Sequence, residues 1–210
     1  MIFLAHRGFW LSKDEQNSEL AFVRALENGF GIETDIRDYN GKVVISHDIP
    51  HNDCVTFEHF IEICSRYRGV LALNVKADGL QKYVNDDILN YVGDAYFFDM
   101  SVPDLIGYLK SNLPFLIRLS DVETDSHFLK ESKGVWLDNF SSSRLNLEFM
   151  ENSLKKGKLV TLVSPELHGY DHLSYWQELK DFIELFPKFE NNIHLCTDFP
   201  QKAKEFFYGK

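Results

Sequence analysis

Cysteine is scarce in this sequence, and its spacing excludes two common ways of stabilising a fold. The 210 residues contain three cysteines, Cys54, Cys64 and Cys196, and none of them forms a Cys-x-x-Cys pair. An odd number of widely separated cysteines does not make a disulfide framework, and no Cys/His cluster has the spacing of a zinc site. We therefore expect free, mostly buried thiols in a reducing compartment, which favours a cytoplasmic protein.

Long apolar runs and excess positive charge are also lacking. The apolar start of the chain (residues 1–5) is too short for a signal peptide, and no segment approaches the roughly 18 apolar residues of a membrane span. The net charge of −10 argues against non-specific binding to nucleic acid or to anionic membranes, because both favour basic patches. A small-molecule partner remains, and the sequence carries no signal of oligomeric state.

Short apolar segments alternate with amphipathic segments along the whole chain. Strands are predicted at residues 1–6, around Glu33 and Asp35 with a hairpin return, and at 71–76, 95–99, 115–119, 135–138, 159–163 and 193–198. Helices are predicted between them: from a cap at Asn17 or Ser18 to Leu26, from Thr56, at 80–92, from Val102, at 125–131, at 144–156 with a serine cap, at 171–186 and from Pro200.

This alternation predicts the fold class. Apolar strands separated by amphipathic helices indicate parallel pairing, and eight such units favour a (β/α)8 TIM barrel over an open doubly wound sheet. No Gly-x-Gly-x-x-Gly loop follows the first strand, which counts against a dinucleotide-binding fold. We expect one α/β barrel domain over residues 1–210, with an extra β-hairpin at the second strand and no large cap insertion.

Residues 31–48 carry the densest group of chemically active side chains. Glu33 and Asp35 are two positions apart, so on a strand they project from the same face. Asn40-Gly41 is a strong signal for a type I′ turn, which folds the chain back and brings His47 towards the two acids. Carboxylate oxygens suit Mg²⁺ or Ca²⁺. The alternative is that the acids pair with Arg7 or Arg37 in an ion network.

Other polar residues stand where predicted strands end, which in a barrel of this type is where active sites lie. His6 and His47 come from separate strands and could act as general acid and base. Arg7 and Lys76 could bind a phosphate group, or they could pair with Glu33, Asp35 or Asp99. Asn74 shares the strand face of Lys76. His168 is a further open candidate, although most histidines here are better explained as structural or exposed.

Five segments resemble one known family in order and approximate spacing. They are AHRG (5–8), QNSELAFVRALENG (16–29), IETDIRDYNGKVVISHD (32–48), LNVK (73–76) and TDFP (197–200). Together they resemble the glycerophosphodiester phosphodiesterase family, within the phospholipase C-like phosphodiesterases. The resemblance covers nearly the whole chain, and its most specific parts are the HRG, ExD and HD elements.

The resemblance implies a (β/α)8 barrel that uses a divalent cation, Mg²⁺ or Ca²⁺, to hydrolyse glycerophosphodiesters, an activity of lipid metabolism. The expected products are sn-glycerol 3-phosphate and an alcohol. It implies His6 and His47 as the acid/base pair, and Arg7 and Lys76 as phosphate contacts. It further implies Glu33 and Asp35 as metal ligands. The asparagine of the family's Glu-Asn motif maps to Asn17, while its glutamate maps to Gln16.

The sequence departs from the family pattern at three points. Asn74 stands where the family has a glutamate as a third metal ligand, and a neutral amide ligand predicts weaker cation binding. The insertion that covers the site in many members is nearly absent after His47-Asp48. Glu166, in VSPELHG (163–169), is a candidate replacement ligand by position alone. Two alternative functions follow from Asn74: a non-hydrolytic phosphodiester-binding barrel, and a transphosphorylase that releases a cyclic phosphate.

Overall fold

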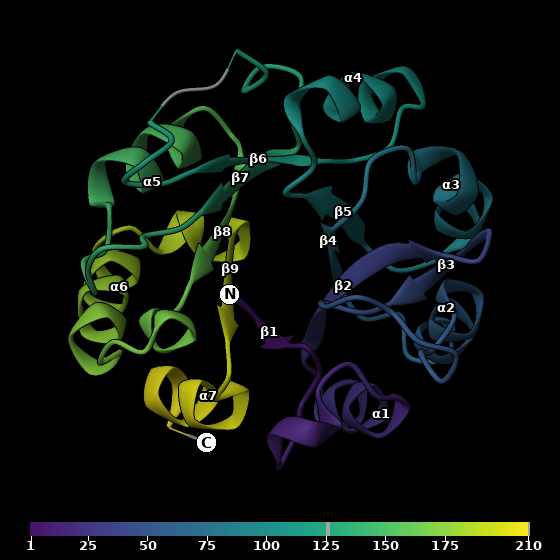
Figure 1. Cartoon of the computed structure of the whole chain (residues 1–210). Coiled ribbons are helices and arrows are strands. Elements are labelled where there is room, and N and C mark those ends of the chain that lie inside the picture. Colours follow the sequence, from purple (N-terminus) through teal and green to yellow (C-terminus); the bar gives the residue numbers. More distant parts are fainter. Residues whose placement is uncertain (125–126, 210) are drawn as a thin grey trace. The chain divides into compact units, whose positions relative to one another are not determined.

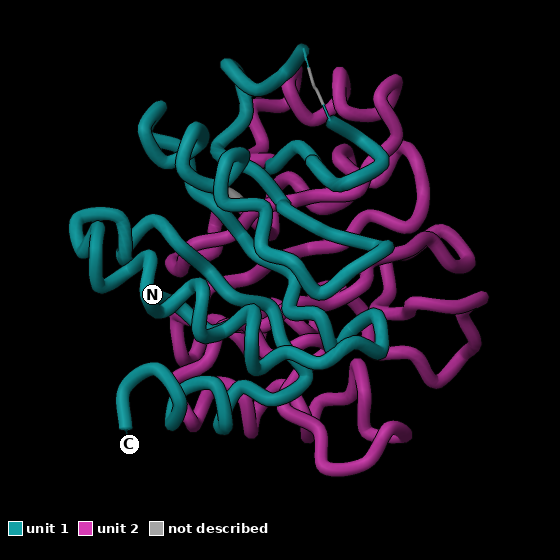
Figure 2. Tube along the Cα trace, turned by 90° about the vertical axis from the view of Figure 1, so that its left-hand side faces the viewer, with its two compact units in different colours: residues 1–3, 116–210 teal, residues 4–115 magenta. Residues whose placement is uncertain are grey.

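The computed structural model describes residues 1–124 and 127–209, and the chain divides into two compact units. Residues 4–115 form one unit, which we call the N-terminal unit, and residues 1–3 with 116–210 form the C-terminal unit (Figure 2). Strand β1 (Ile2–His6) runs across the boundary.

The N-terminal unit contains the elements from β1 to α4 (Figure 1). Its parallel strands follow the order β5-β4-β2-β1, and β3 pairs with β2 in the antiparallel direction. After β1 the elements are η1 (Lys13–Glu15), α1 (Glu19–Glu27), β2 (Gly31–Tyr39), β3 (Lys42–Ile45), α2 (Phe57–Ser65), β4 (Leu71–Val75), α3 (Gln81–Asn90), β5 (Ala95–Phe98) and α4 (Val102–Lys110).

The C-terminal unit contains four more parallel strands in the order β9-β8-β7-β6. Its elements are β6 (Leu116–Leu119), β7 (Gly134–Leu137), α5 (Leu147–Lys155), β8 (Leu159–Val163), η2 (Pro165–His168), α6 (Leu173–Leu185), η3 (Pro187–Asn192), β9 (Ile193–Thr197) and α7 (Pro200–Tyr208). Strands β4, β8 and β9 are buried along their whole length, as expected for parallel strands with side chains packed on both faces.

The fold class is the predicted (β/α)8 TIM barrel, with β3 as the extra strand on β2. The hairpin prediction is also confirmed. Asn40 and Gly41 both have positive φ angles, 48° and 78°, as a type I′ turn requires, and Tyr39 pairs with Lys42 across the turn. This register sets Ile45 opposite Ile36, so the chain after β3 returns along β2 towards its acids.

The caps of two early helices are confirmed, whereas the cap of a later helix is wrong. The Ser18 and Thr56 side chains accept hydrogen bonds from Ala21 N and His59 N at the starts of α1 and α2. Helix α5, however, begins at Leu147 and not at 144, and its cap is Asn146 and not a serine. The serines before it are held by other loop groups, for example Ser142 by Asn139.

The helix predicted at 125–131 is not found. Its residues 125 and 126 lie outside the described part of the chain, and residues 127–131 form turns. The Lys158 ammonium donates to the carbonyls of Lys130 and Ser132, at 2.8 and 2.6 Å. These bonds satisfy carbonyl groups at the end of the segment and just beyond it.

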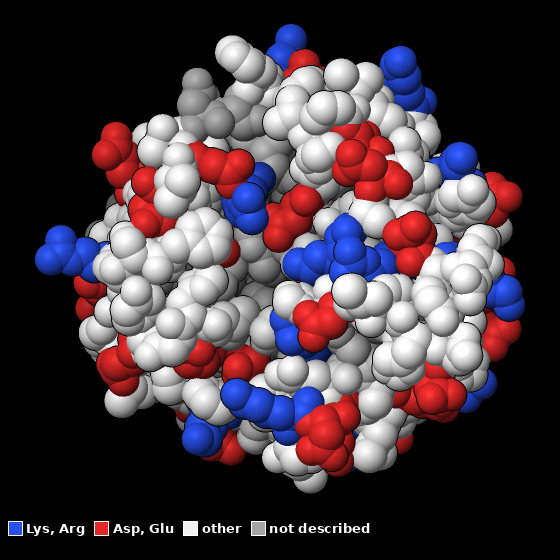
Figure 3. All heavy atoms as spheres, in the orientation of Figure 1, with Lys and Arg blue, Asp and Glu red and all other residues white. Residues whose placement is uncertain are grey.

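No helix among the described residues is long and apolar enough to cross a membrane. Cys64 and Cys196 are buried and Cys54 is half-buried, and no disulfide links the cysteines in the part of the chain that the structure describes. Burial raises the pKa of the Cys64 thiol well above its usual range. On the face drawn in Figure 3, acidic and basic side chains are interspersed, so the net charge of −10 is not gathered into one broad area there.

Candidate functional site

The site begins where β1 ends. Arg7 adopts a left-handed backbone conformation (φ 57°), followed by Gly8 (φ 85°). A Cβ atom at Gly8 would lie 2.8 Å from the Cβ of Ala21, so only glycine fits against α1. The turn lets the Arg7 amide donate to the Glu33 backbone carbonyl (2.8 Å) and to its carboxylate (3.3 Å). The strained residue is thus fixed beside an acidic side chain, as is common at functional sites.

Strand β2 supplies two buried carboxylates. Glu33 and Asp35 are 2% and 1% exposed, and they lie on one face of β2. The strand register sets His6 opposite Glu33, and Asn74 opposite Asp35. The structure therefore brings together the residues that the sequence predicted at the ends of β1, β2 and β4.

Asp35 is the centre of an ion network. Its carboxylate lies 3.3 Å from Arg7 Nε and 3.4 Å from Lys76 Nζ, and it accepts a hydrogen bond from Asn17 Nδ2 (3.0 Å). The Thr34 hydroxyl in turn donates to Asn17 Oδ1 (2.8 Å). The ion-pair alternative is thus realised for Asp35 with Arg7. The two cations lie together at one acid, where they could also contact an anionic substrate.

Glu33 has fewer donors around it. Its carboxylate lies 3.8 Å from His6 Nε2, and among the described residues it accepts one hydrogen bond, from the Arg7 amide. Burial, together with the negative charge of Asp35, raises the pKa of Glu33 from 4.5 to about 7, although His6, Lys76 and Arg7 act in the opposite direction. A further positive charge near this carboxylate would favour its ionised form.

Asn74 contributes an unsatisfied acceptor. The residue is 9% exposed, and its buried Oδ1 atom has no hydrogen-bond partner in the described part of the chain. An orphaned amide oxygen next to Glu33 and Asp35 completes a set of three oxygen donors that suits a hard divalent cation. No group of three or more His, Cys, Asp or Glu side chains in residues 1–124 and 127–209 is arranged to hold a metal. The residues therefore fit a cation only if the neutral Asn74 takes part.

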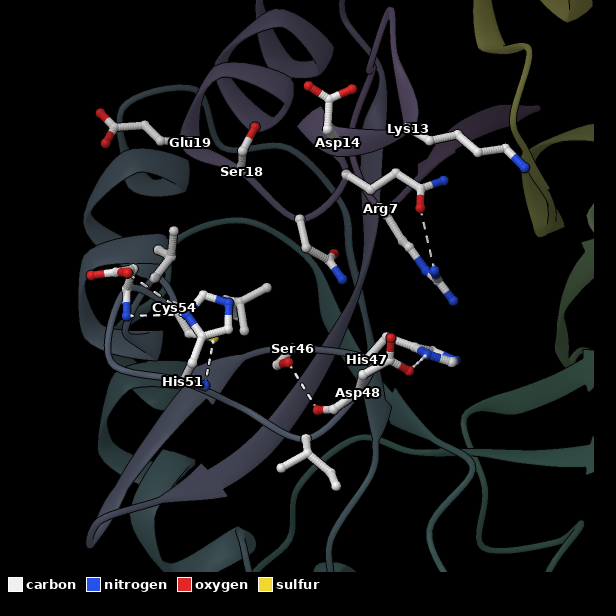
Figure 4. Close-up of a pocket in the computed structure, with 16 residues that line it drawn as sticks. Arg7, Lys13, Asp14, Ser18, Glu19, Ser46, His47, Asp48, His51 and Cys54 are labelled. Carbon is white, nitrogen blue, oxygen red and sulfur yellow. Dashed lines mark hydrogen bonds and ion pairs between the residues drawn. The ribbon is translucent and has the colours of Figure 1, made fainter.

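His47 follows β3 and is nearly half exposed. Its Nδ1 atom lies 2.8 Å from the Asp48 carboxylate, and Arg37 donates to its backbone carbonyl (3.2 Å). The hydrogen bond to His47 lowers the pKa of Asp48, so Asp48 stays ionised and orients the imidazole. His47 and Arg7 line the same cavity of about 500 Å³ (Figure 4). Arg37 thus supports the histidine loop, not the acids.

Sequence reasoning missed several supporting residues. The Trp10 indole donates to the His6 carbonyl (3.0 Å), and Thr34 holds Asn17 in place. No local pattern in the sequence marks either residue. Asn17 was indicated as a site residue only through the family resemblance, and its φ angle of 57° shows why an asparagine, which tolerates this conformation, stands there.

Glu166 and His168 lie in the C-terminal unit. Glu166 accepts hydrogen bonds from the hydroxyls of Thr197 and Ser164 and from the Asp198 amide (3.2 Å), which links the ends of β8 and β9. His168 Nε2 lies 2.7 Å from the Asp138 carboxylate. A ligand role for Glu166 stays a prediction, since its carboxylate already has these partners.

Neither a protein-family model nor a curated protein matches the chain. Solved structures do. A glycerophosphodiester phosphodiesterase from Agrobacterium tumefaciens superposes with a TM-score of 0.70 at 16% identity, covering 95% of this chain and 97% of that one. The resemblance in sequence and the similarity in structure therefore indicate the same fold.

A second solved structure gives the same result. It is an Oleispira antarctica phosphodiesterase in complex with the product sn-glycerol-3-phosphate, with a TM-score of 0.69 at 14% identity, covering 98% of this chain and 96% of that one. At this identity the likeness establishes the fold, which is the (β/α)8 barrel that the resemblance implied.

Proposed function

We propose that the chain is a metal-assisted phosphodiesterase that hydrolyses glycerophosphodiesters or a related small phosphodiester. One observation carries the proposal: the acids Glu33 and Asp35 on β2 lie beside Arg7, which follows β1, and beside Lys76 and the unsatisfied Asn74 oxygen at the end of β4. The carboxylates and the Asn74 oxygen suit a divalent metal ion, and the Arg7 and Lys76 side chains suit a phosphate group. The fold neighbours, one of them with sn-glycerol-3-phosphate bound, support the same reaction class.

The charges of this cluster favour a phosphoryl transition state. The two carboxylates and the two fixed cations cancel, so a divalent cation and a singly charged phosphodiester would together leave one excess positive charge. Additional negative charge that develops on the phosphoryl oxygens during reaction would then meet a positive site. Arg7 and Lys76 would exchange part of their contact with Asp35 for the phosphate oxygens.

A divalent cation, Mg²⁺ or Ca²⁺, held by Glu33, Asp35 and Asn74, would supply Lewis-acid polarisation of a phosphoryl oxygen. In the proposed reaction, one of His6 and His47 accepts the proton of the attacking hydroxyl or water. The other histidine donates a proton to the leaving alcohol oxygen. Because Asp48 engages Nδ1 of His47, Nε2 is the atom of that ring that exchanges a proton.

Asn74 favours a second candidate function. Without a third carboxylate the cation is bound more weakly, and a barrel that binds phosphodiesters without turning them over is one consequence. A transphosphorylase that stops at a cyclic phosphate is the other. Both keep the same binding residues, but the first releases no product and the second releases a cyclic phosphate.

The test is cleavage of glycerophosphoglycerol with Mg²⁺, with Ca²⁺ and with EDTA, followed by phosphorus NMR of the products. We expect sn-glycerol 3-phosphate with either metal and loss of turnover with EDTA. Turnover that EDTA leaves unchanged would remove the metal from the proposal. A cyclic product would select the transphosphorylase. A folded protein with no turnover under any of these conditions would select the binding barrel.

A further inference from the structure

Arg7, which the proposed function places at the substrate phosphate, makes an incomplete ion pair with Asp35. Its Nε atom lies 3.3 Å from the Asp35 carboxylate, but this nitrogen is buried and has no hydrogen-bond partner in the described part of the chain. Arginine and carboxylate groups that pair freely often form two parallel hydrogen bonds of about 2.7–2.9 Å. The guanidinium therefore lies beside Asp35 without being fully docked onto it.

The guanidinium instead hydrogen-bonds to a neutral group. Its Nη1 atom donates to Oε1 of Gln16 at 3.4 Å, the contact marked by the dashed line at Arg7 in Figure 4. Among residues 1–124 and 127–209 this is the one hydrogen bond that the Arg7 side chain makes. A guanidinium carries five N–H donors, so its terminal nitrogens keep further donors for a ligand. Arg7 and Gln16 both line the cavity that contains His47.

The segment that carries Gln16 is held by contacts of its own. The Gln16 backbone amide closes η1 by donating to the Lys13 carbonyl (3.3 Å). The next residue, Asn17, donates from its backbone amide to the Arg7 carbonyl (2.9 Å) and from its side chain to Asp35 (3.0 Å). Gln16 and Asn17 are thus consecutive residues that each hold one partner of the Arg7–Asp35 pair.

The charge of the Gln16 side chain matters as well as its position. Asp35 lies within 3.4 Å of both Arg7 and Lys76, so it already offsets part of each positive charge. A carboxylate in place of the Gln16 amide would offset the Arg7 charge further, whereas the amide accepts the same hydrogen bond without adding negative charge. The Arg7 side chain is only 22% exposed, so water screens its charge incompletely.

We propose that Gln16 is a positioning residue for the phosphate of the substrate. Its amide oxygen holds the Arg7 guanidinium away from full pairing with Asp35, and its neutrality leaves the positive charge available to phosphate oxygens. The inference rests on the proposed function, because that function takes Arg7 as a phosphate contact. Loss of the Gln16 amide should let Arg7 dock onto Asp35, which weakens phosphate binding while the chain stays folded.

The first test measures binding without turnover. Calorimetric titration with sn-glycerol 3-phosphate compares the starting protein with Gln16→Ala and Gln16→Glu. We expect the affinity to fall about three- to tenfold in Gln16→Ala, and at least as far in Gln16→Glu, which keeps an acceptor but adds a negative charge. Unchanged affinity in Gln16→Ala, or no binding by the starting protein, would overturn the inference. Unchanged affinity in Gln16→Glu would contradict the role of the neutral charge.

The control for these variants is Gln177→Ala. Gln177 is exposed on α6, outside the cavity, and its amide also has a side-chain partner, Asp181 at 2.7 Å. We expect this variant to bind sn-glycerol 3-phosphate as the starting protein does. Thermal melting checks folding, and Gln16→Ala should melt close to the starting protein because only a partly buried side chain is removed. Unfolding of Gln16→Ala would assign Gln16 to the structure and contradict the proposal.

The second test asks whether Gln16 acts through Arg7. In the starting protein, Gln16→Ala should lower kcat/KM about three- to tenfold, chiefly by raising KM. In an Arg7→Lys background the same change should alter kcat/KM by less than about twofold, because lysine lacks the forked group that Gln16 orients. Equal losses in the two backgrounds would show that Gln16 acts independently of Arg7, and would refute the assignment.

The positioning role and the proposed hydrolysis can fail separately. If the starting protein does not turn over glycerophosphoglycerol, the proposed hydrolysis fails, whereas a Gln16-dependent affinity for sn-glycerol 3-phosphate would still support the positioning role. Conversely, full turnover and full phosphate affinity in Gln16→Ala would refute the positioning role and leave the proposed function intact.

Discussion

The two units each bury a glutamate near a strand end, and the two glutamates differ in how well they are satisfied. Glu166, in the C-terminal unit, accepts from two hydroxyls and one amide. The carboxylate of Glu33, in the N-terminal unit, accepts one hydrogen bond among the described residues, at 3.3 Å, and its pKa is raised to about 7. A carboxylate surrounded by donors stabilises the fold around it, whereas one that is short of donors costs stability and is available to a ligand.

The same contrast holds for the groups near each glutamate. Next to Glu33, the buried Asn74 oxygen has no partner in the described residues, whereas the Ser164 hydroxyl beside Glu166 also accepts from the Trp176 indole at 2.8 Å. Buried polar groups without partners are uncommon in folded proteins and need an explanation. In the N-terminal unit, a bound cation is the explanation that the proposed function offers.

Replacing the unsatisfied glutamate gives the largest expected effect. In Glu33→Gln the amide oxygen can still accept from the Arg7 amide, but the charge that the cation requires is lost. We expect kcat/KM to fall about 10²- to 10³-fold, with a melting temperature that is unchanged or higher, because a buried ionisable group is removed. Kinetics and thermal melting measure the two effects. The exposed Glu27→Gln variant is the control, and full activity of Glu33→Gln would exclude a catalytic role for this carboxylate.

Replacing Glu166, whose carboxylate has several donors, should reduce stability and leave activity nearly unchanged. In Glu166→Gln, one carboxylate oxygen becomes an amide donor that faces the hydroxyl and amide donors of the site. We expect a loss of about 1–3 kcal/mol in unfolding free energy, with kcat/KM and cation affinity within about threefold of the starting protein. Denaturant unfolding and calorimetry check this, with the exposed Glu184→Gln as control. Weaker cation binding in a folded Glu166→Gln protein would instead support Glu166 as the replacement ligand.

The sequence predicted which residues form the site, but it did not predict their hydrogen bonding or the pKa of Glu33. The hairpin at Asn40-Gly41 and the alternation around Glu33 and Asp35 are local properties, so their geometry could be predicted. The orphaned Asn74 oxygen and the raised pKa of Glu33 could not, because both depend on which donors several strands bring within reach.

Restoring a charge at Asn74 tests whether the neutral amide limits cation binding. Asn74→Asp adds a carboxylate beside Glu33 and Asp35, so we expect the affinity for Mg²⁺ or Ca²⁺ to rise about tenfold. The same variant without metal should be less stable by about 1 kcal/mol, because three acids then share one buried site. Calorimetric titration with the metal alone measures affinity, and Asn74→Ala is the comparison that should weaken it. Unchanged affinity in both variants would remove Asn74 from the ligand set.

The smallest expected effect concerns an exposed contact between a histidine and two glutamates. Solvent there hydrates the polar groups that the protein leaves unpaired. His59 on α2 lies 3.1 Å from Glu19 and 3.4 Å from Glu62, and the hydrogen bond to Glu19 is the main cause that raises the pKa of His59 above 6.5. This contact stabilises the folded chain fully at pH values below the unfolded pKa, and the contribution is lost as pH rises through the higher folded value.

We therefore expect His59→Gln to lower the melting temperature slightly at pH 5.5 and not at pH 8.5, which lie about one to two units on either side of an ordinary histidine pKa. The control is His127→Gln. High salt should reduce the His59 effect, since the group is exposed. A pH-independent loss in His59→Gln would show that the ring contributes by packing and not by charge.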